Sequence, residues 1–114
     1  MIDDLIIHQK TYDFLLWLYP LINKFPKSQR FVLGQQIENK TLDVLTAISR
    51  ANNEREKSGA LKQLSLELDG LRLLIRLAKD LHFLTVKHYE TAADKINEIG
   101  RLLHGWQNKF SNAI

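Results

Sequence analysis

Hydrophobic residues recur at intervals of three and four along most of the chain, a period typical of amphipathic helices that bury one face. Four segments carry this pattern, and we expect helices over residues 4–25, 28–51, 58–81 and 85–108. The polar run 52–59 is the clearest loop between them. Ser28 and Thr85 are the expected N-caps of the second and fourth helices, because their hydroxyl oxygens can accept hydrogen bonds from free backbone amides.

Two residues inside these helices are poor helix formers and predict local irregularities. Pro20 removes one helical hydrogen bond, so the first helix must kink there or restart, and Phe25-Pro26 marks its end. Gly34 costs about 1 kcal/mol relative to alanine in a helix interior. That cost indicates a close crossing with a neighbouring helix at Gly34.

The first and third helices are apolar on more than one side. The first carries two stripes, which are Tyr12, Leu15, Leu16, Tyr19 and Ile22, and beside them Phe14, Leu18, Leu21 and Phe25. The third is apolar over about two-thirds of its circumference, through Leu61, Leu64, Leu68, Leu71, Ile75 and Ala78 and through Leu66, Leu73, Leu74, Leu77 and Leu81. Either this helix lies at the centre of a bundle, or its second face is an oligomer interface.

The second and fourth helices each carry one apolar stripe. In the second we expect the inward residues Phe31, Gly34, Ile37, Leu42, Leu45 and Ile48. The fourth follows a strict heptad through Tyr89, Ala92, Ile96, Ile99, Leu103, Trp106 and Phe110, with Val86, Ala93 and Gly100 alongside. These aromatics, with Tyr12, Trp17 and Tyr19, are expected in the core rather than as stacking platforms for bases. The pattern predicts an all-α fold, an antiparallel up-down-up-down four-helix bundle, as one domain over residues 1–114.

Composition agrees with a few long helices. The 114 residues are 45% hydrophobic with only two prolines and five glycines, too few turn signals for a β-sandwich. Zero cysteines exclude a disulfide scaffold and a thiolate metal site. The strongest apolar run, residues 14–22, is far shorter than the ~20 residues that span a bilayer. The acidic opening Met1-Ile2-Asp3-Asp4 is unlike a secretory signal, so we expect a cytoplasmic protein.

The sequence lacks the common catalytic and metal-binding motifs. No Glu-x-x-His or His-x-x-x-His pair occurs among His8, His82, His88 and His104, and no phosphate loop or nucleophile elbow is present. We therefore predict no catalytic residues, no metal site and no cofactor, and interpret the protein as a non-enzyme.

Basic residues provide the one candidate site. The net charge is only +3, with eight basic and four acidic residues concentrated in positions 23–62. Arg72, Arg76 and Lys79 fall within about 60° of one another on the third helix. Two further groups lie at the helix junctions, namely Lys24, Lys27 and Arg30, and Arg50, Arg55 and Lys57. Such groups can bind nucleic-acid phosphates.

A solvated surface explains the same residues. Asp69 precedes Arg72 by three positions and Asp80 follows Arg76 by four, so part of the group can be ordinary intrahelical ion pairing. The residues alone leave both interpretations open.

The sequence resembles the accessory variability determinant (Avd) protein of diversity-generating retroelements. The resemblance covers nearly the whole chain and is carried by residues 12–20 (YDFLLWLYP), 24–38 (KFPKSQRFVLGQQIE), 68–81 (LDGLRLLIRLAKDL), 89–90, 98–103 and 105–106. The Phe-Pro-Lys-x-x-Arg-Phe-x-Leu-Gly run is its most specific part. The same superfamily includes proteins encoded in intervening sequences of bacterial large-subunit ribosomal RNA, which is the alternative family.

The resemblance implies a four-helix bundle that assembles into a homo-oligomer, a pentameric barrel with a basic surface. It implies partners, namely a reverse transcriptase and nucleic acid, template RNA or DNA, during mutagenic copying of a template repeat into a variable gene. The nucleic-acid-binding residues it implies are Arg72, Arg76, Lys79, Lys27 and Arg30, and we add Lys24 from the same junction group as a predicted contact. Arg30 can instead be structural, tying the loop to a helix end. A third hypothesis is an oligomeric interaction scaffold that does not bind nucleic acid.

Overall fold

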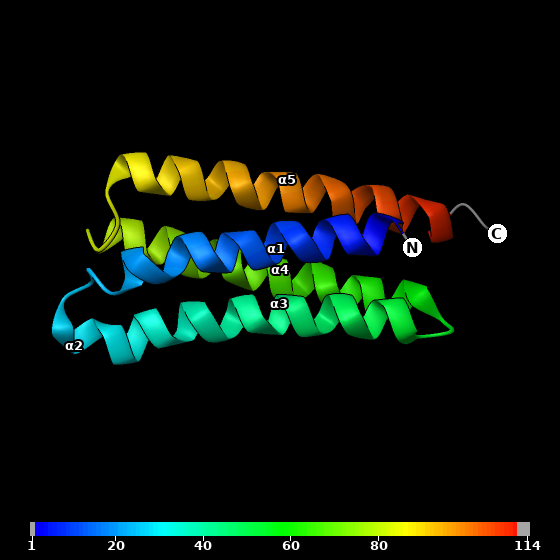
Figure 1. Cartoon of the computed structure of the whole chain (residues 1–114), viewed down its shortest axis with the longest axis horizontal. Coiled ribbons are helices and arrows are strands. Elements are labelled where there is room, and N and C mark those ends of the chain that lie inside the picture. The colour runs from blue at the N-terminus through cyan, green and yellow to red at the C-terminus, as the bar shows by residue number, and fades with distance from the viewer. Residues whose placement is uncertain (1, 112–114) are drawn as a thin grey trace.

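The computed structural model describes the backbone of residues 2–111 and the side chains of residues 5–110. Its elements are α1 (Ile2–Ile22), α2 (Lys27–Gln29), the π-helical turn η1 (Arg30–Gly34), α3 (Gln35–Asn53), α4 (Lys57–Asp80) and α5 (Val86–Ser111). The long helices run antiparallel, up-down-up-down, in a bundle of 49 × 23 × 20 Å (Figure 1). Helix α1 packs against α3 and α5, and α4 packs against the same two, so α1 and α4 are diagonally opposed.

The four long helices bury one face each in a common core, as the apolar pattern predicts. All six residues expected on the inward face of α4 are buried, namely Leu61, Leu64, Leu68, Leu71, Ile75 and Ala78. The heptad of α5 is likewise buried from Ala92 to Trp106, and Tyr89 and Phe110 pack against its two ends. The bundle prediction is confirmed.

Helix α1 buries one of its two apolar stripes and only part of the other. Phe14 and Leu18 of one stripe are buried, whereas the other stripe buries Leu15 and Ile22 but exposes Tyr12, Leu16 and Tyr19. The expectation that both tyrosines belong to the core is therefore wrong, because one chain supplies no helix to cover their side of α1. The helix also continues through Pro20 without restarting and ends at Ile22, three residues earlier than expected.

The second predicted helix is interrupted near its start. The chain forms α2 and the π-helical turn η1 before α3 begins, and Pro26 occupies the N-cap of α2 in place of Ser28. The turn buries Leu33 and Gly34, which leaves Phe31 78% exposed. The inward placement expected for Phe31 is wrong for this reason. It is also wrong for Leu42, which is exposed on α3.

Gly34 lies at the close crossing that its sequence position suggested. A Cβ atom built on Gly34 is 2.7 Å from Ile22 Cγ2 and 3.3 Å from the Gln29 carbonyl oxygen. Both neighbours are held in place, one in the core and one in the backbone. Only glycine fits this contact between η1 and the end of α1.

Lys57 closes the loop between α3 and α4. Its ammonium donates hydrogen bonds to the carbonyl oxygens of Ala51, Asn52 and Glu54 at 2.9, 3.0 and 2.9 Å, where α3 has free acceptors. Glu56 caps α4 by accepting hydrogen bonds from the hydroxyl and the backbone amide of Ser58, and these two bonds hold the pKa of the Glu56 carboxyl below its ordinary value. The loop is thus shorter than the polar run 52–59 suggests.

The corner between α4 and α5 forms a Schellman motif. The Phe83 amide donates to the Ala78 carbonyl and the His82 amide to the Lys79 carbonyl, with His82 at a φ of 65°. Thr85 then begins α5 as the expected N-cap, because its hydroxyl accepts from the His88 amide at 3.0 Å. This corner contacts the end of α1 through Phe25 and Phe83, whose ring centroids are 5.7 Å apart.

We predict that Gly34→Ala lowers the free energy of unfolding by about 1–3 kcal/mol, because the new methyl group overpacks the contact with Ile22. Gly59→Ala is the matched control, since a Cβ there has no neighbour within 4 Å. The control should gain about 0.5–1 kcal/mol from helix propensity. Urea denaturation measures both, and equal effects at the two positions would contradict the close-crossing interpretation.

We predict that His82→Gly raises the free energy of unfolding by about 0.5–1 kcal/mol, because a side chain in the left-handed region is strained and glycine is not. His82→Ala keeps the Cβ atom and serves as the control without that gain. Thermal melts of the two variants test this, and a larger gain in the alanine variant would show that the imidazole, not the backbone, is responsible.

Candidate nucleic-acid interface

Arg72, Arg76 and Lys79 lie together on the α5 side of α4, as their spacing predicts, and we call them the α4 basic wedge. Their side chains are 39%, 69% and 33% exposed. Arg72 Nε is 4.0 Å from Asp69, Arg76 Nε is 3.7 Å from Asp80, and Lys79 Nζ is 3.4 Å from Asp80. The intrahelical pairing considered above is therefore present.

These ion pairs are long and exposed, and they are therefore weak. Exposed pairs of this length contribute about 0.2–0.5 kcal/mol, which a phosphate can displace. Arg76 and Lys79 also share one carboxylate, that of Asp80. Lys79 Nζ additionally lies 4.7 Å from the centroid of the Tyr89 ring, which fixes it against α5. The wedge carries more positive than negative charge.

Arg72 reaches across to α5 beside an open groove. Its Nη1 donates to Asn97 Oδ1 at 2.6 Å, and a Cβ atom at Gly100 would lie 2.6 Å from its Nη2. The groove has a volume of about 530 Å³ and is lined by Arg72, Asn97, Gly100, Arg101, His104 and Gly105. Sequence reasoning missed Arg101 and His104, although their spacing of three residues on one helix face was a usable signal.

The junction group has mixed roles. Arg30 Nε donates to the Phe25 carbonyl oxygen at 3.2 Å, so it ties the turn to the end of α1, the structural role considered for it. Lys24 and Lys27 are exposed, and no carboxylate of the described residues pairs with either. Because Phe25 contacts Phe83, this junction and the end of α4 meet at one end of the bundle.

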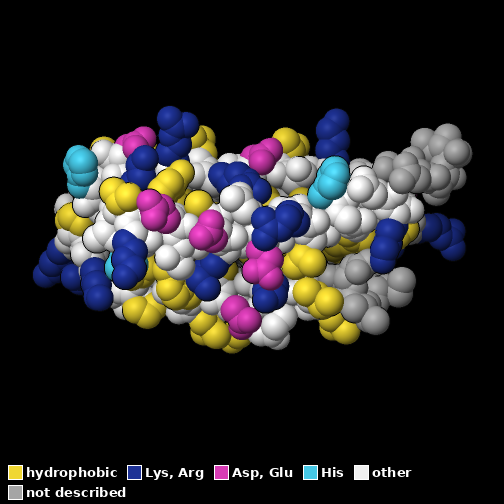
Figure 2. All heavy atoms as spheres, turned by 90° about the horizontal axis from the view of Figure 1, so that it is seen from above, with side chains coloured by type: hydrophobic (Ala, Val, Ile, Leu, Met, Phe, Trp, Pro, Cys, Tyr) yellow, Lys and Arg dark blue, Asp and Glu magenta, His cyan; other side chains and the backbone are white. Residues whose placement is uncertain are grey.

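Figure 2 looks onto α5 and shows the distribution of charge on that face. Lys and Arg side chains occur along its whole length, with the densest group at the left end, where Figure 1 places α2 and the corner between α4 and α5. Acidic side chains lie between them, and hydrophobic ones gather along the lower edge.

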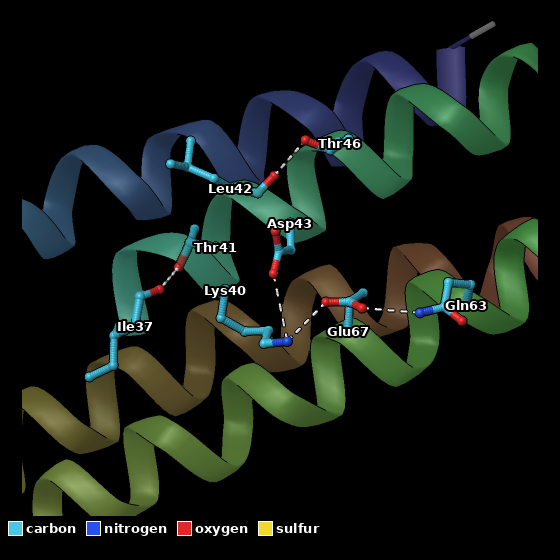
Figure 3. A network of polar contacts seen from close by, with 8 residues as sticks. All are labelled: Ile37, Lys40, Thr41, Leu42, Asp43, Thr46, Gln63 and Glu67. Atoms are coloured by element: carbon cyan, nitrogen blue, oxygen red, sulfur yellow. Dashed lines mark hydrogen bonds and ion pairs between the residues drawn. The ribbon is translucent and has the colours of Figure 1, made fainter. Parts of the chain in front are cut away.

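Lys40, on the neighbouring α3–α4 face, is a cation whose charge is balanced by nearby carboxylates. Its Nζ is 3.1 Å from Glu67 Oε2 and 3.7 Å from Asp43 Oδ2, and Gln63 donates to the same Glu67 carboxylate (Figure 3). The hydrogen bond to Glu67, with the nearby carboxylate charges, raises the pKa of Lys40. Two carboxylates for one ammonium make this face a poor site for phosphate.

Two apolar stripes remain outside the core. The α4 leucine stripe is Leu66, Leu73, Leu77 and Leu81, and the α1 stripe is Leu5, Tyr12, Leu16 and Tyr19, all between 42% and 67% exposed. Because α1 and α4 are diagonally opposed, the stripes lie on different sides of the bundle. The placement of α4 at the centre of a bundle is wrong, since no helix of the described chain covers its second face.

Other classes of site receive no support from the described residues. Among them, no three His, Asp or Glu side chains are grouped so that they could hold a metal ion. No helix within this part of the chain is long and apolar enough to cross a membrane.

Fold and surface together define a four-helix bundle protein whose one candidate site is a basic seam between two helices. Comparison with known families makes this more specific, because the family model described as bAvd-like matches residues 5–110. The chain belongs to the bAvd-like family. The resemblance that the sequence motifs indicated is confirmed.

A solved structure shares this fold. It is the crystal structure of a protein of unknown function from the S23 ribosomal protein family of Bacteroides thetaiotaomicron, at a TM-score of 0.81 and 19% identity. The match covers 93% of this chain and 98% of that one. Among curated proteins, none matches the sequence significantly.

Proposed function

We propose that this protein is an Avd-type accessory factor of a diversity-generating retroelement. It binds a reverse transcriptase and nucleic acid, template RNA or DNA, and supports mutagenic copying without catalysing it. Membership of the bAvd-like family carries this assignment. The exposed α4 basic wedge, opposed by only two carboxylates, supports the nucleic-acid part.

The contact with nucleic acid is electrostatic. Arg76 is the most exposed member of the wedge, and its pair with Asp80 is long enough for a phosphate oxygen to replace the carboxylate. Lys24 and Lys27 add unpaired charge at the same end of the bundle. Each phosphate neutralised releases counterions, so affinity falls as salt rises.

The two apolar stripes support assembly into a ring, and the resemblance to Avd supports five subunits. A two-fold dimer pairs like surfaces, whereas two different apolar surfaces on opposite sides favour head-to-tail contacts, which close into a ring. In this arrangement the α4 leucine stripe of each subunit packs against the α1 stripe of the next. The basic wedge then recurs around the ring.

We predict that the double variant Arg72→Ala, Arg76→Ala weakens nucleic-acid binding and lowers the slope of log affinity against log salt by about two. Arg50→Ala, Arg55→Ala is the matched control, because it removes the same charge at the other end of the bundle. Fluorescence anisotropy with labelled RNA and DNA between about 50 and 200 mM salt measures both slopes.

Equal losses in the two double variants would show that net charge rather than the wedge drives binding. A wild-type protein that binds reverse transcriptase but ignores RNA and DNA would support the scaffold hypothesis. A gene located inside a ribosomal RNA intervening sequence, with no reverse transcriptase nearby, would select the alternative family.

We predict that Leu16→Glu and Leu73→Glu each abolish the ring, because each buries a charge in one half of the head-to-tail contact. Mixed together, they should form a one-to-one pair, since each variant keeps the stripe that the other lacks. Light scattering coupled to size exclusion measures the masses, and Val86→Glu, exposed but outside both stripes, is the control. Intact oligomers in either single variant would argue against head-to-tail assembly.

A further inference from the structure

The groove beside Arg72 differs from the other surfaces of the bundle in its lining. Three basic side chains face it, Arg72 from α4 and Arg101 and His104 from α5, and no carboxylate lines it. Two cations on other faces of the bundle pair closely with carboxylates, Lys40 with Glu67 and Lys10 with Glu98. A groove with basic groups on both walls favours an anionic ligand.

Arg72 is held with part of its guanidinium free. Nη1 donates to Asn97 Oδ1, and Nε is 4.0 Å from Asp69, beyond hydrogen-bonding distance. Among the described residues, none accepts a hydrogen bond from Nη2, which lies over Gly100. Arginine carries five donors in a rigid fork that suits phosphate oxygens, so this geometry leaves donors available at the groove.

Two glycines of α5, Gly100 and Gly105, line the groove. Gly100 leaves room for Arg72, because a Cβ there would lie 2.6 Å from its Nη2. Gly105 has no such packing reason, since a Cβ would meet nothing within 4 Å. A glycine in a helix lowers the stability of the fold, and at Gly105 no close packing explains its presence. Such glycines are typical of places where a ligand approaches the backbone.

We infer that this groove binds a backbone phosphate of the nucleic acid, held between Arg72 on α4 and Arg101 and His104 on α5. The inference rests on the proposed function and extends the site from one helix to the seam between two. A polymer suits the groove better than a free ion does, because Lys79 continues the basic row about 10 Å further along α4. A second hollow shares Arg72 with the groove and is also lined by Tyr89, the ring beside Lys79 Nζ.

The test measures oligonucleotide affinity and thermal stability of the full-length protein in parallel. Arg101→Ala should weaken binding of a labelled single-stranded oligonucleotide by about tenfold and lower the salt slope by about one. Arg55→Ala is the control, because Arg55 is also an exposed arginine. It should change the affinity and the salt slope less than Arg101→Ala does. Gly105→Ala should raise the melting temperature by a few degrees and yet weaken binding, because its methyl group blocks close approach.

Gly59→Ala is the control for the glycine effect, since it has equally open surroundings outside the groove. It should raise the melting temperature and leave affinity unchanged. If Arg101→Ala and Gly105→Ala both bind like their controls while the Arg72, Arg76 double variant binds weakly, the groove is not a contact, and the proposed function still stands. If the wild-type protein binds no nucleic acid, both are overturned.

Two further outcomes identify a different occupant. In an NMR titration with inorganic phosphate, the chemical shifts of the Gly100 and Gly105 amides report binding in the groove. If these shifts saturate well below millimolar phosphate, the ligand is a free phosphoryl compound and the polymer assignment is overturned. Loss of reverse-transcriptase binding in Arg101→Ala, with oligonucleotide affinity intact, would indicate a carboxylate of the protein partner instead.

Discussion

Each long helix of the bundle can bury only one face in the shared core. The residues on its other faces therefore determine the surface of the protein. Helices α3 and α5 have one apolar face each and bury most of it, although Leu42 of α3 is exposed. Helices α1 and α4 have two, and their second faces are exposed on opposite sides of the protomer. Exposed apolar stripes of this length are uncommon on monomers and typical of interaction surfaces.

The same constraint places the positive charge. One face of α4 is buried in the core, and the leucine stripe lies on nearly the opposite face. The polar and charged residues of α4 therefore lie on the two sides between these faces. On the α3 flank, Glu67 compensates Lys40. On the α5 flank, Arg72 meets the uncharged Asn97. The seam between α4 and α5 is basic because Asp69 and Asp80 are two carboxylates against the three cations of the wedge.

The periodicity of hydrophobic residues predicted the bundle well, because a three-four repeat marks the helix face that is buried in the core. It failed where local backbone geometry determines the structure. The π-helical turn at Arg30–Gly34 depends on the contact between Gly34 and Ile22, which joins residues that the helical period does not relate. Arg101 and His104 were missed for a similar reason, since the groove exists only once α4 lies beside α5. The wedge on α4 was predictable because it belongs to one helix.

The modest net charge of +3 does not oppose a nucleic-acid role, because the relevant quantity is the local arrangement of charge. Ions screen charges beyond about 8–10 Å, so distant acids on the protomer scarcely weaken the seam. The proposed head-to-tail assembly through the stripes of α1 and α4 would bury leucines and tyrosines rather than the wedge's cations. A ring would therefore repeat the basic seam without covering those cations, and a long polyanion could contact several copies where a single protomer offers one.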